Sequence, residues 1–321
     1  MKRRDFVAGA AGTGATLSLF PAGLAGLERE VSASGLERRA LGRTGESLSV
    51  VGFGGVVVDG ATAEEATRSV AWAIDAGINY FDVAPTYGNA EDMLGPALAP
   101  YREDVFLACK TQERTRDGAL AELDRSLSKM QTDRFDLYQH HAVTKTADVE
   151  TILGPGGAME GFEAARKAGK VRFVGFSAHS VEAALALIDG YDFDSILFPV
   201  NFATWTAGDF GPQVLAEAQA KGMGILCLKA LAKGPWPDGA EKRYEKCWYE
   251  PLDQTAEADL ALRFTLSHPV TAAIPPGDPG LFEMAVKLAR GFTPVTSEEE
   301  TELKRKAAAG TPLFRYPSPA A

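Results

Sequence analysis

Eight short apolar runs, each followed by a helix-length amphipathic segment, limit the fold of this chain more than any other feature. Runs that are apolar almost throughout are typical of parallel strands that are covered on both faces. Eight such strand–helix units are the number that closes into a barrel. We therefore predict an α/β fold, a (β/α)8 TIM barrel, with strands at residues 50–54, 78–84, 105–111, 135–140, 171–176, 196–200, 225–231 and 271–274.

The segments between these runs have the periodicity of amphipathic helices. In residues 63–76, for example, Ala66, Val70 and Ala73 fall on one face. The longest interruption, residues 232–255, contains Gly234-Pro235-Trp236-Pro237, and we interpret it as an active-site loop rather than a domain boundary. The predicted helices are residues 63–76, 117–130, 158–168, 181–188, 212–221, 256–267 and 279–289.

Composition narrows the classes of function. The formal net charge of −10 predicts a surface that repels nucleic acid and anionic membranes, so we expect no nucleic-acid partner. The three cysteines include no CxxC pair and indicate neither a disulfide framework nor a zinc motif, and we assign no metal ligands. Cys109 and Cys227 lie in predicted strands and are expected to pack in the core, whereas Cys247 lies in the long loop.

The first 33 residues have the layout of an export signal. Arg3-Arg4 precedes Phe6, and residues 6–27 contain no charged side chain. A positive start before a modest apolar stretch is typical of secretory signals, and the paired arginines resemble a twin-arginine signal, which directs export of a folded protein. Cleavage sites with small residues are Gly23-Leu24-Ala25 and Val31-Ser32-Ala33.

The apolar stretch contains Gly, Ser and Thr residues and Pro21, which make it a poor membrane-spanning helix. We therefore expect residues 1–33 to be a signal segment recognised by the twin-arginine export machinery. The mature protein is then periplasmic or otherwise exported, and no stable membrane span remains after processing.

Polar residues that carry chemistry stand where three successive predicted strands end. Asp82 lies near the end of the second strand, Lys110 near the end of the third, and His141 directly after the fourth. Tyr87 lies in the loop that follows the second strand. The active sites of such barrels lie at the C-terminal ends of the strands. We therefore expect these four side chains to lie together at that open end of the barrel, which we call the mouth.

These residue types together suit proton transfer to a carbonyl. An acid and an ammonium on neighbouring parallel strands can pair across a strand spacing of about 4.8 Å. The ammonium of Lys110 is expected to lower the pKa of Tyr87 below its usual value of about 10. Tyr87 can then give a proton to a carbonyl oxygen or take one back, while a neutral His141 donates a hydrogen bond to the same oxygen.

The chain has four histidines, and their positions separate their expected roles. Side chains alternate along a strand, so His140 is expected to point away from the mouth that His141 faces. His179 follows the fifth strand and is a second candidate for the mouth, or else caps the next helix. His268, beside a proline, is predicted to be a surface turn residue.

Asp82, Tyr87, Lys110 and His141 resemble the Asp–Tyr–Lys–His tetrad of the aldo-keto reductases. Leu41-Gly42-Arg43-Thr44-Gly45 and the segment 52–55 are similar to that family's opening hairpin and first strand, and residues 169–177 to its fifth strand. The resemblance runs from about residue 36 to about residue 288. It implies a barrel with an N-terminal hairpin, which we assign to residues 36–315. It also implies a nicotinamide cofactor, usually NADPH, and interconversion of a carbonyl and an alcohol.

At the positions where the family binds its cofactor, this sequence departs from the family pattern. The family usually has Ser-Asn after the fifth strand, where this chain has Ser177-Ala178, and Leu197 stands where a glutamine is usual. Leu228 replaces the tyrosine that commonly stacks on nicotinamide; leucine covers a ring face but supplies no π contact. The cofactor-binding residues that the resemblance implies are Gly54, Ser177, Ala178, Asn201, Leu228, Lys229, Pro276, Gly277 and Asp278.

The last loop has the signature of a phosphate-facing helix start. Asp278 is a suitable N-cap with Pro279 at the first helical position, and the free backbone N–H groups there, with Gly277, can face a phosphate. NADP-specific members of the family use Lys or Arg in this loop, which has neither, although Lys229 can supply a positive charge. We expect NADP as the cofactor, with NAD as the alternative.

Two other functions stay open from the sequence. One is a metal-dependent barrel hydrolase or isomerase that uses His141, His179 and nearby carboxylates, although Lys110 beside Asp82 is poorly explained by metal binding. The other is a catalytically silent barrel that binds a ligand. The leading hypothesis is a nicotinamide-dependent oxidoreductase that acts on a sugar-like or other small carbonyl or alcohol.

Overall fold

A computed structural model describes residues 29–32 and 34–317 of the chain. The predicted export signal, residues 1–33, lies outside the described residues except for 29–32. In the described part of the chain, no helix is long and apolar enough to cross a membrane.

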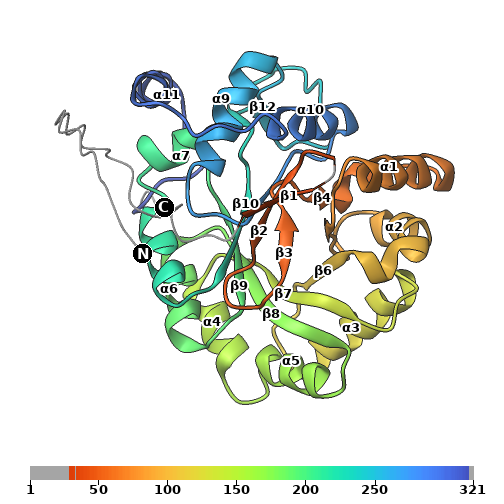
Figure 1. Ribbon diagram of the computed structural model, residues 1–321. Coiled ribbons are helices and arrows are strands. Elements are labelled where there is room, and N and C mark those ends of the chain that lie inside the picture. Colours follow the sequence, from red (N-terminus) through yellow and green to blue (C-terminus); the bar gives the residue numbers. More distant parts are fainter. Residues whose placement is uncertain (1–28, 33, 318–321) are drawn as a thin grey trace, which may run out of the picture.

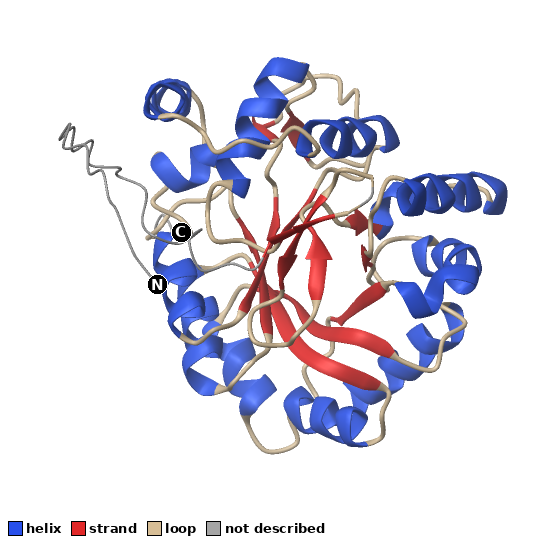
Figure 2. Ribbon diagram, in the orientation of Figure 1, coloured by secondary structure: helices blue, strands red, loops and turns tan. Residues whose placement is uncertain are grey.

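Eight parallel strands form the centre of the molecule, and helices surround them (Figures 1 and 2). Each strand pairs with the next along the chain, and a parallel bridge between Val51 and Ala273 joins the last strand to the first. The predicted (β/α)8 barrel is therefore confirmed. The strands are β4 (Phe53–Gly54), β5 (Tyr80–Asp82), β6 (Phe106–Thr111), β7 (Phe135–Val143), β8 (Val171–Ala178), β9 (Ser195–Pro199), β10 (Gly224–Leu228) and β13 (Ala272–Ile274).

All seven predicted helices are present: α1 (Ala63–Asp75), α3 (Arg116–Lys129), α5 (Ala158–Lys167), α6 (Val181–Gly190), α8 (Pro212–Ala220), α9 (Thr255–Leu266) and α10 (Pro279–Ala289). The described residues also form 3-10 helices η2 (Gly55–Val58) and η3 (Ala99–Asp104), and helices α2 (Ala90–Leu98), α4 (Thr146–Leu153), α7 (Phe202–Thr206) and α11 (Ser297–Ala309). The long loop contains an antiparallel pair, β11 (Ala232–Pro235) and β12 (Tyr249–Pro251).

An antiparallel sheet of β1 (Arg29–Val31), β2 (Glu37–Ala40) and β3 (Ser47–Ser49) lies against the barrel and contains the expected N-terminal hairpin. It contacts residues that precede the barrel strands: the Ser49 amide donates to Asn79 Oδ1 at 2.7 Å, and Thr271 Oγ1 donates to the Ala40 carbonyl at 2.9 Å. The buried Arg39 donates from Nη1 to two backbone carbonyls at the end of α9 and just beyond it, both at 2.9 Å. The sheet therefore closes the end of the barrel where the strands begin.

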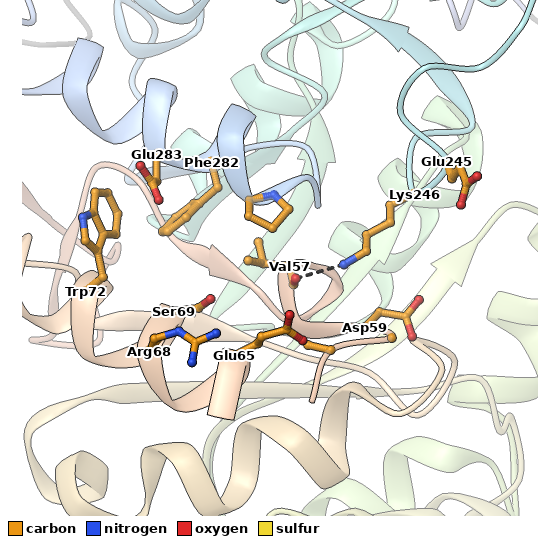
Figure 3. A pocket seen from close by; sticks show the side chains of 13 residues that line it. Val57, Asp59, Glu65, Arg68, Ser69, Trp72, Glu245, Lys246, Phe282 and Glu283 are labelled. Carbon is orange, nitrogen blue, oxygen red and sulfur yellow. Dashed lines mark hydrogen bonds between the residues drawn. The ribbon is translucent and has the colours of Figure 1, made fainter. Parts of the chain in front are cut away.

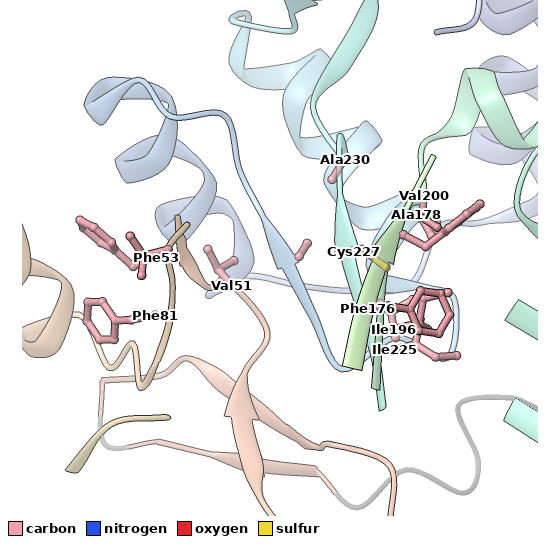
Figure 4. Close-up of a cluster of buried hydrophobic side chains, with 14 of the residues drawn as sticks. Val51, Phe53, Phe81, Phe176, Ala178, Ile196, Val200, Ile225, Cys227 and Ala230 are labelled. Atoms are coloured by element: carbon pink, nitrogen blue, oxygen red, sulfur yellow. The ribbon is translucent and has the colours of Figure 1, made fainter. Parts of the chain in front are cut away.

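Two apolar clusters hold the barrel together. The larger one lies between the strands and the surrounding helices; within it Phe53 and Phe81, from neighbouring strands, have ring centroids 5.2 Å apart (Figure 4). The smaller one includes Leu48 of the hairpin with Tyr80 and Leu137 from the barrel strands. Since both clusters exclude water, the strand ends that carry the polar residues are held rigidly.

Two sequence-based expectations about single residues need correction or completion. His268 is not a surface turn residue: it is partly buried at the end of α9, 4.2 Å from the Trp205 ring between centroids. Its Nδ1 lies 2.8 Å from the Phe264 carbonyl oxygen, so it contributes to the helix end. Cys247, whose exposure the sequence left open, is buried, as are Cys109 and Cys227.

Candidate active site

The structure brings Asp82, Tyr87, Lys110 and His141 together at the end of the barrel where the strands finish. Asp82 is the last residue of β5, Lys110 lies next to the end of β6, and His141 lies near the end of β7. Tyr87 lies in the short loop between β5 and α2. The pairing of these strands in order places the three strand residues side by side around one mouth.

Lys110 is the centre of the cluster. Its side chain is fully buried and forms an ion pair with Asp82 Oδ1. Lys110 Nζ also donates to the Val83 carbonyl at 3.2 Å and to the Tyr87 hydroxyl at 3.3 Å. The ammonium therefore contacts the phenol oxygen while the acid and one carbonyl hold it in place.

Asp82 is held in turn by two side chains that the sequence did not single out. Its Oδ2 accepts a hydrogen bond from Gln139 Nε2 at 3.1 Å and another from the Tyr80 hydroxyl at 3.2 Å. Both donors are buried barrel residues. Every oxygen of this carboxylate thus has a partner, which fixes the position of Lys110.

The electrostatics of Tyr87 differ from the sequence-based expectation. Burial raises the pKa of Tyr87, and although the Lys110 ammonium lowers it, the net pKa lies above the ordinary value. Burial by itself lowers the pKa of Lys110, but Asp82 and Tyr87 raise it above the usual range, so Lys110 stays charged. The prediction that Tyr87 has a pKa below its ordinary value is wrong, because loss of solvent outweighs the neighbouring charge.

A β-bulge aims His141 at Tyr87. The register between β7 and β8 shifts after His140, and Ala142 has φ +52°, a conformation that L-residues rarely adopt. The His141 ring lies edge-on to the Tyr87 ring, with centroids 5.7 Å apart, while His140 is fully buried and stacks on Phe162 at 4.0 Å.

His141 is neutral in this setting. Burial, followed by the charge of Lys110, lowers the pKa of His141 to about 2. Its Nδ1 lies 3.5 Å from the Thr86 hydroxyl. A neutral imidazole next to Tyr87 can donate a hydrogen bond but carries no charge that would compete with Lys110.

A cavity of about 170 Å³ opens beside Tyr87 and Asp82. Five of the nine residues implied for cofactor binding line it: Gly54, Leu228, Lys229, Pro276 and Gly277. Leu197, which stands at the family's glutamine position, also lines it, and the residues that the sequence did not assign to the site are Val56, Lys246, Cys247, Trp248, Tyr249, Ile274 and Pro275. The long loop supplies several of these, which agrees with its interpretation as an active-site loop.

The other four implied cofactor residues hold the protein itself together. Ser177 Oγ accepts from the Ala142 amide at 2.8 Å and supports the bulge, and Ala178 is fully buried. Asn201 caps α7 through Oδ1 and donates from Nδ2 to the carbonyls of Lys229, at 3.1 Å, and Ala232, at 2.6 Å. Asp278 caps α10 by accepting from the Leu281 amide at 3.1 Å.

The cavity fits the flat ring of a nicotinamide but offers few partners for its carboxamide. Leu197, Leu228 and Ile274 line one apolar surface that a planar ring can cover. The side-chain amide of Asn201 is already used at α7. The ring would therefore be held mainly by apolar contact.

A larger groove of about 680 Å³ lies outside the mouth, between α1 and α10 (Figure 3). Trp72 and Phe282 line it, with ring centroids 5.8 Å apart, together with Arg68 and several acids. Lys246 lines both the groove and the cavity and donates to the Val57 carbonyl at 3.0 Å. Pro279, which the sequence placed at the start of the phosphate-facing helix, lines this groove, whereas none of the four tetrad residues does.

A metal-dependent mechanism needs a cluster of ligands. Among the residues that the structure describes, no group of three or more His, Cys, Asp or Glu side chains is placed to hold a metal ion. His141 faces Tyr87, and His179 lies near the Phe314 ring, with centroids 5.5 Å apart. The metal-dependent hydrolase or isomerase is therefore not favoured.

Comparisons with known proteins agree with the fold and with the family resemblance. A model of the Aldo/keto reductase family matches residues 50–277. L-galactose dehydrogenase of Arabidopsis thaliana is 27% identical over 219 residues, 62% of this chain and 66% of its own length. The 6-dehydroglucose reductase of Novosphingobium aromaticivorans is 30% identical over 169 residues, 46% of this chain and 54% of its own length. The holo structure of an aldo-keto reductase from Bacillus halodurans covers 86% of this chain and 98% of its own, with a TM-score of 0.66 and 24% identity.

Proposed function

The chain belongs to the aldo/keto reductase family, and we propose that it interconverts a carbonyl and an alcohol on a small, sugar-like substrate with Tyr87 as the proton donor and acceptor. The observation that carries the proposal is the contact of the Lys110 ammonium with the Tyr87 hydroxyl at the cavity wall. The names of two relatives, a sugar dehydrogenase and a sugar reductase, support the sugar-like substrate.

Residues of this chain carry out the proton transfer. In reduction, the Tyr87 hydroxyl donates its proton to the carbonyl oxygen, and the Lys110 ammonium stabilises the phenolate that remains. Asp82 keeps Lys110 charged and in place. Neutral His141 donates a hydrogen bond to the same substrate oxygen and orients it. In oxidation the proton returns to Tyr87 by the reverse step.

Members of this family use a nicotinamide dinucleotide, which supplies or accepts the hydride when bound. In this chain Leu197, Leu228 and Ile274 would hold the ring, and the backbone at Pro276 and Gly277 would lie along the dinucleotide. We propose NADP as the cofactor with NAD as the alternative, as the family resemblance implies.

Export through the twin-arginine machinery is also a proposal. Its support is the Arg3-Arg4 pair before an uncharged stretch, which resembles a signal for folded proteins. A protein that takes up a cofactor in the cytoplasm must be folded before it crosses the membrane. We therefore place the working enzyme in the periplasm or another exported location.

Replacement of Tyr87 by phenylalanine tests the proton step. The variant lacks the hydroxyl but keeps the ring, so turnover of aldehydes or ketones with NADPH or NADH, and of sugar alcohols with NADP+ or NAD+, is expected to fall on the order of 10²- to 10⁴-fold. Cofactor binding, followed by fluorescence, is expected to stay unchanged. Tyr191→Phe is the matched control, because it removes a tyrosine hydroxyl that is bonded to Glu163 and does not line the cavity. Full activity of Tyr87→Phe would exclude the proposed mechanism.

A further inference from the structure

A second, partly buried ammonium, that of Lys229, lies at the same mouth. Lys229 directly follows β10 and has φ +71°, a strained conformation for a lysine. It lines the cavity with Tyr87 and Asp82. Its Nζ lies 5.1 Å from the centroid of the Trp248 ring and 5.0 Å from that of Tyr249, so two aromatic faces shield it.

The charge of Lys229 has no acid to balance it. Asp82, the one carboxylate among the residues that line the cavity, is bound to Lys110, Gln139 and Tyr80. Along the described chain, no hydrogen bond or ion pair joins Lys229 Nζ to an acceptor. Burial lowers the pKa of Lys229 to about 8, which still leaves it mostly protonated at neutral pH. A shielded charge without a counter-charge costs stability unless a ligand provides one.

The groups near Lys229 carry no negative charge: they are the rings of Trp248 and Tyr249 and the thiol of Cys247, whose pKa burial raises to about 11. Burial, followed by the charge of Lys229, lowers the pKa of His179 to about 4, and the field of Lys229 also reaches His141. When Tyr87 and His141 bind the oxygen of a substrate carbonyl, Lys229 remains in the same cavity without an acceptor. The mouth therefore has more donors than one carbonyl oxygen can use.

We propose that Lys229 binds a carboxylate on the substrate, so that the preferred substrates are small carbonyl compounds or alcohols that carry an acid group. This inference rests on the proposed function, because it places the reacting carbonyl at Tyr87. It gives Lys229 a role toward the substrate in place of the cofactor role that the family resemblance implied. Lys229 lines the same cavity as Tyr87 and Asp82, at the reacting end of the mouth, and this placement supports the role toward the substrate.

The test compares two ligands that differ in charge and little in shape, pyruvate and pyruvamide. Binding to the full chain is measured by calorimetry, which needs no turnover. The unmodified chain is expected to bind pyruvate more tightly than pyruvamide. Lys229→Met is expected to weaken pyruvate binding about 10- to 100-fold, the usual effect of losing a charge-assisted hydrogen bond, and to leave pyruvamide binding unchanged.

Two controls keep the result interpretable. Lys233→Met makes the same substitution at an exposed lysine that pairs with Glu250 at 2.7 Å, and it is expected to leave both ligands unaffected. Thermal unfolding checks that Lys229→Met is folded; since the substitution removes an unbalanced, partly buried charge, the melting temperature without ligand is expected to rise.

Three outcomes would overturn the inference. Equal binding of pyruvate and pyruvamide by the unmodified chain would show that no anion subsite exists. An unchanged preference in Lys229→Met would place that subsite elsewhere. Loss of NADPH binding in Lys229→Met, with the preference for pyruvate retained, would assign Lys229 to the cofactor phosphates. A chain that binds pyruvate through Lys229 but reduces no carbonyl would instead refute the proposed function and leave the subsite standing.

Discussion

At Tyr87 two opposing influences set the proton affinity of the phenol. Removal from water raises its pKa, and the Lys110 ammonium at 3.3 Å lowers it. Burial has the larger effect, so the hydroxyl is protonated at neutral pH and is ready to act as an acid. Lys110 then acts mainly on the phenolate that forms as the proton leaves, where its charge is most favourable.

These pKa values predict a flat pH profile for reduction. His141, with a pKa of about 2, and Tyr87, with a raised pKa, do not change protonation between about pH 5 and pH 7. The kcat for reduction of an uncharged aldehyde is therefore expected to stay constant over that range. Oxidation needs the phenolate, so its kcat is expected to increase with pH. Steady-state kinetics in both directions provide the measurement, and an inflection near the ordinary histidine pKa in reduction would contradict it.

At the scale of elements, two irregular strand ends aim the functional side chains. The bulge at Ala142 directs His141, and the positive φ of Lys229 directs its ammonium. Asn201 connects these features to the helices: its side chain caps α7 and ties the backbone of Lys229 and Ala232. The family resemblance implied that Asn201 binds the cofactor, but in the structure Asn201 holds the loop after β10 in place.

Asn201→Ala is expected to destabilise the fold. The substitution removes two hydrogen bonds at the start of α7 and two donated to backbone carbonyls. A cost of about 2–4 kcal/mol in the free energy of unfolding is expected, because a helix cap and buried hydrogen bonds are lost together. Urea denaturation measures the change. Asn89→Ala, at the start of α2, is the comparison: it removes no capping bond and only two exposed or half-buried hydrogen bonds, to Gly60 and Ala61, so it is expected to cost less.

The strands and the tetrad could be predicted because they depend on local patterns. Each barrel strand is a short apolar run, and Asp82, Lys110 and His141 stand at or near the ends of three such runs. Helix α2 escaped prediction because Gly95 and Pro96 interrupt it; Gly95 packs so close to Met130 that a Cβ would lie 2.6 Å from its Cα. Trp248 and Tyr249 reach the cavity only because β11 and β12 pair across a long loop, a contact that leaves no periodic signal.

Over the whole molecule, the N-terminal sheet and the active-site mouth occupy opposite ends of the barrel. β1 pairs with β2 through three residues, and Leu36 is fully buried. The turn between these two strands also packs closely on the segment that joins α1 to β5, since a Cβ at Gly77 would lie 2.0 Å from Ser34 Oγ. The segment that follows the uncharged stretch is therefore part of the folded barrel.

This packing predicts where the proposed signal is cut. Cleavage after Ala25 keeps β1, whereas cleavage after Ala33 removes it together with its pairing to β2. We expect the exported protein to begin at Gly26, because loss of β1 exposes backbone groups of the sheet. Mass spectrometry of the protein recovered from the periplasm determines the new N-terminus. A mature chain that starts at Ser34 would show that β1 is dispensable.

The placement of the N-terminal sheet also decides how the protein can be handled. Because the sheet lies at the foot of the barrel, anything fused ahead of Arg29 emerges remote from Tyr87 and Lys229. A purification tag or a tether to a solid support at that terminus leaves the reaction chamber unobstructed. The molecule is thus suited to immobilisation in one orientation, with every copy presenting its chamber to the solution.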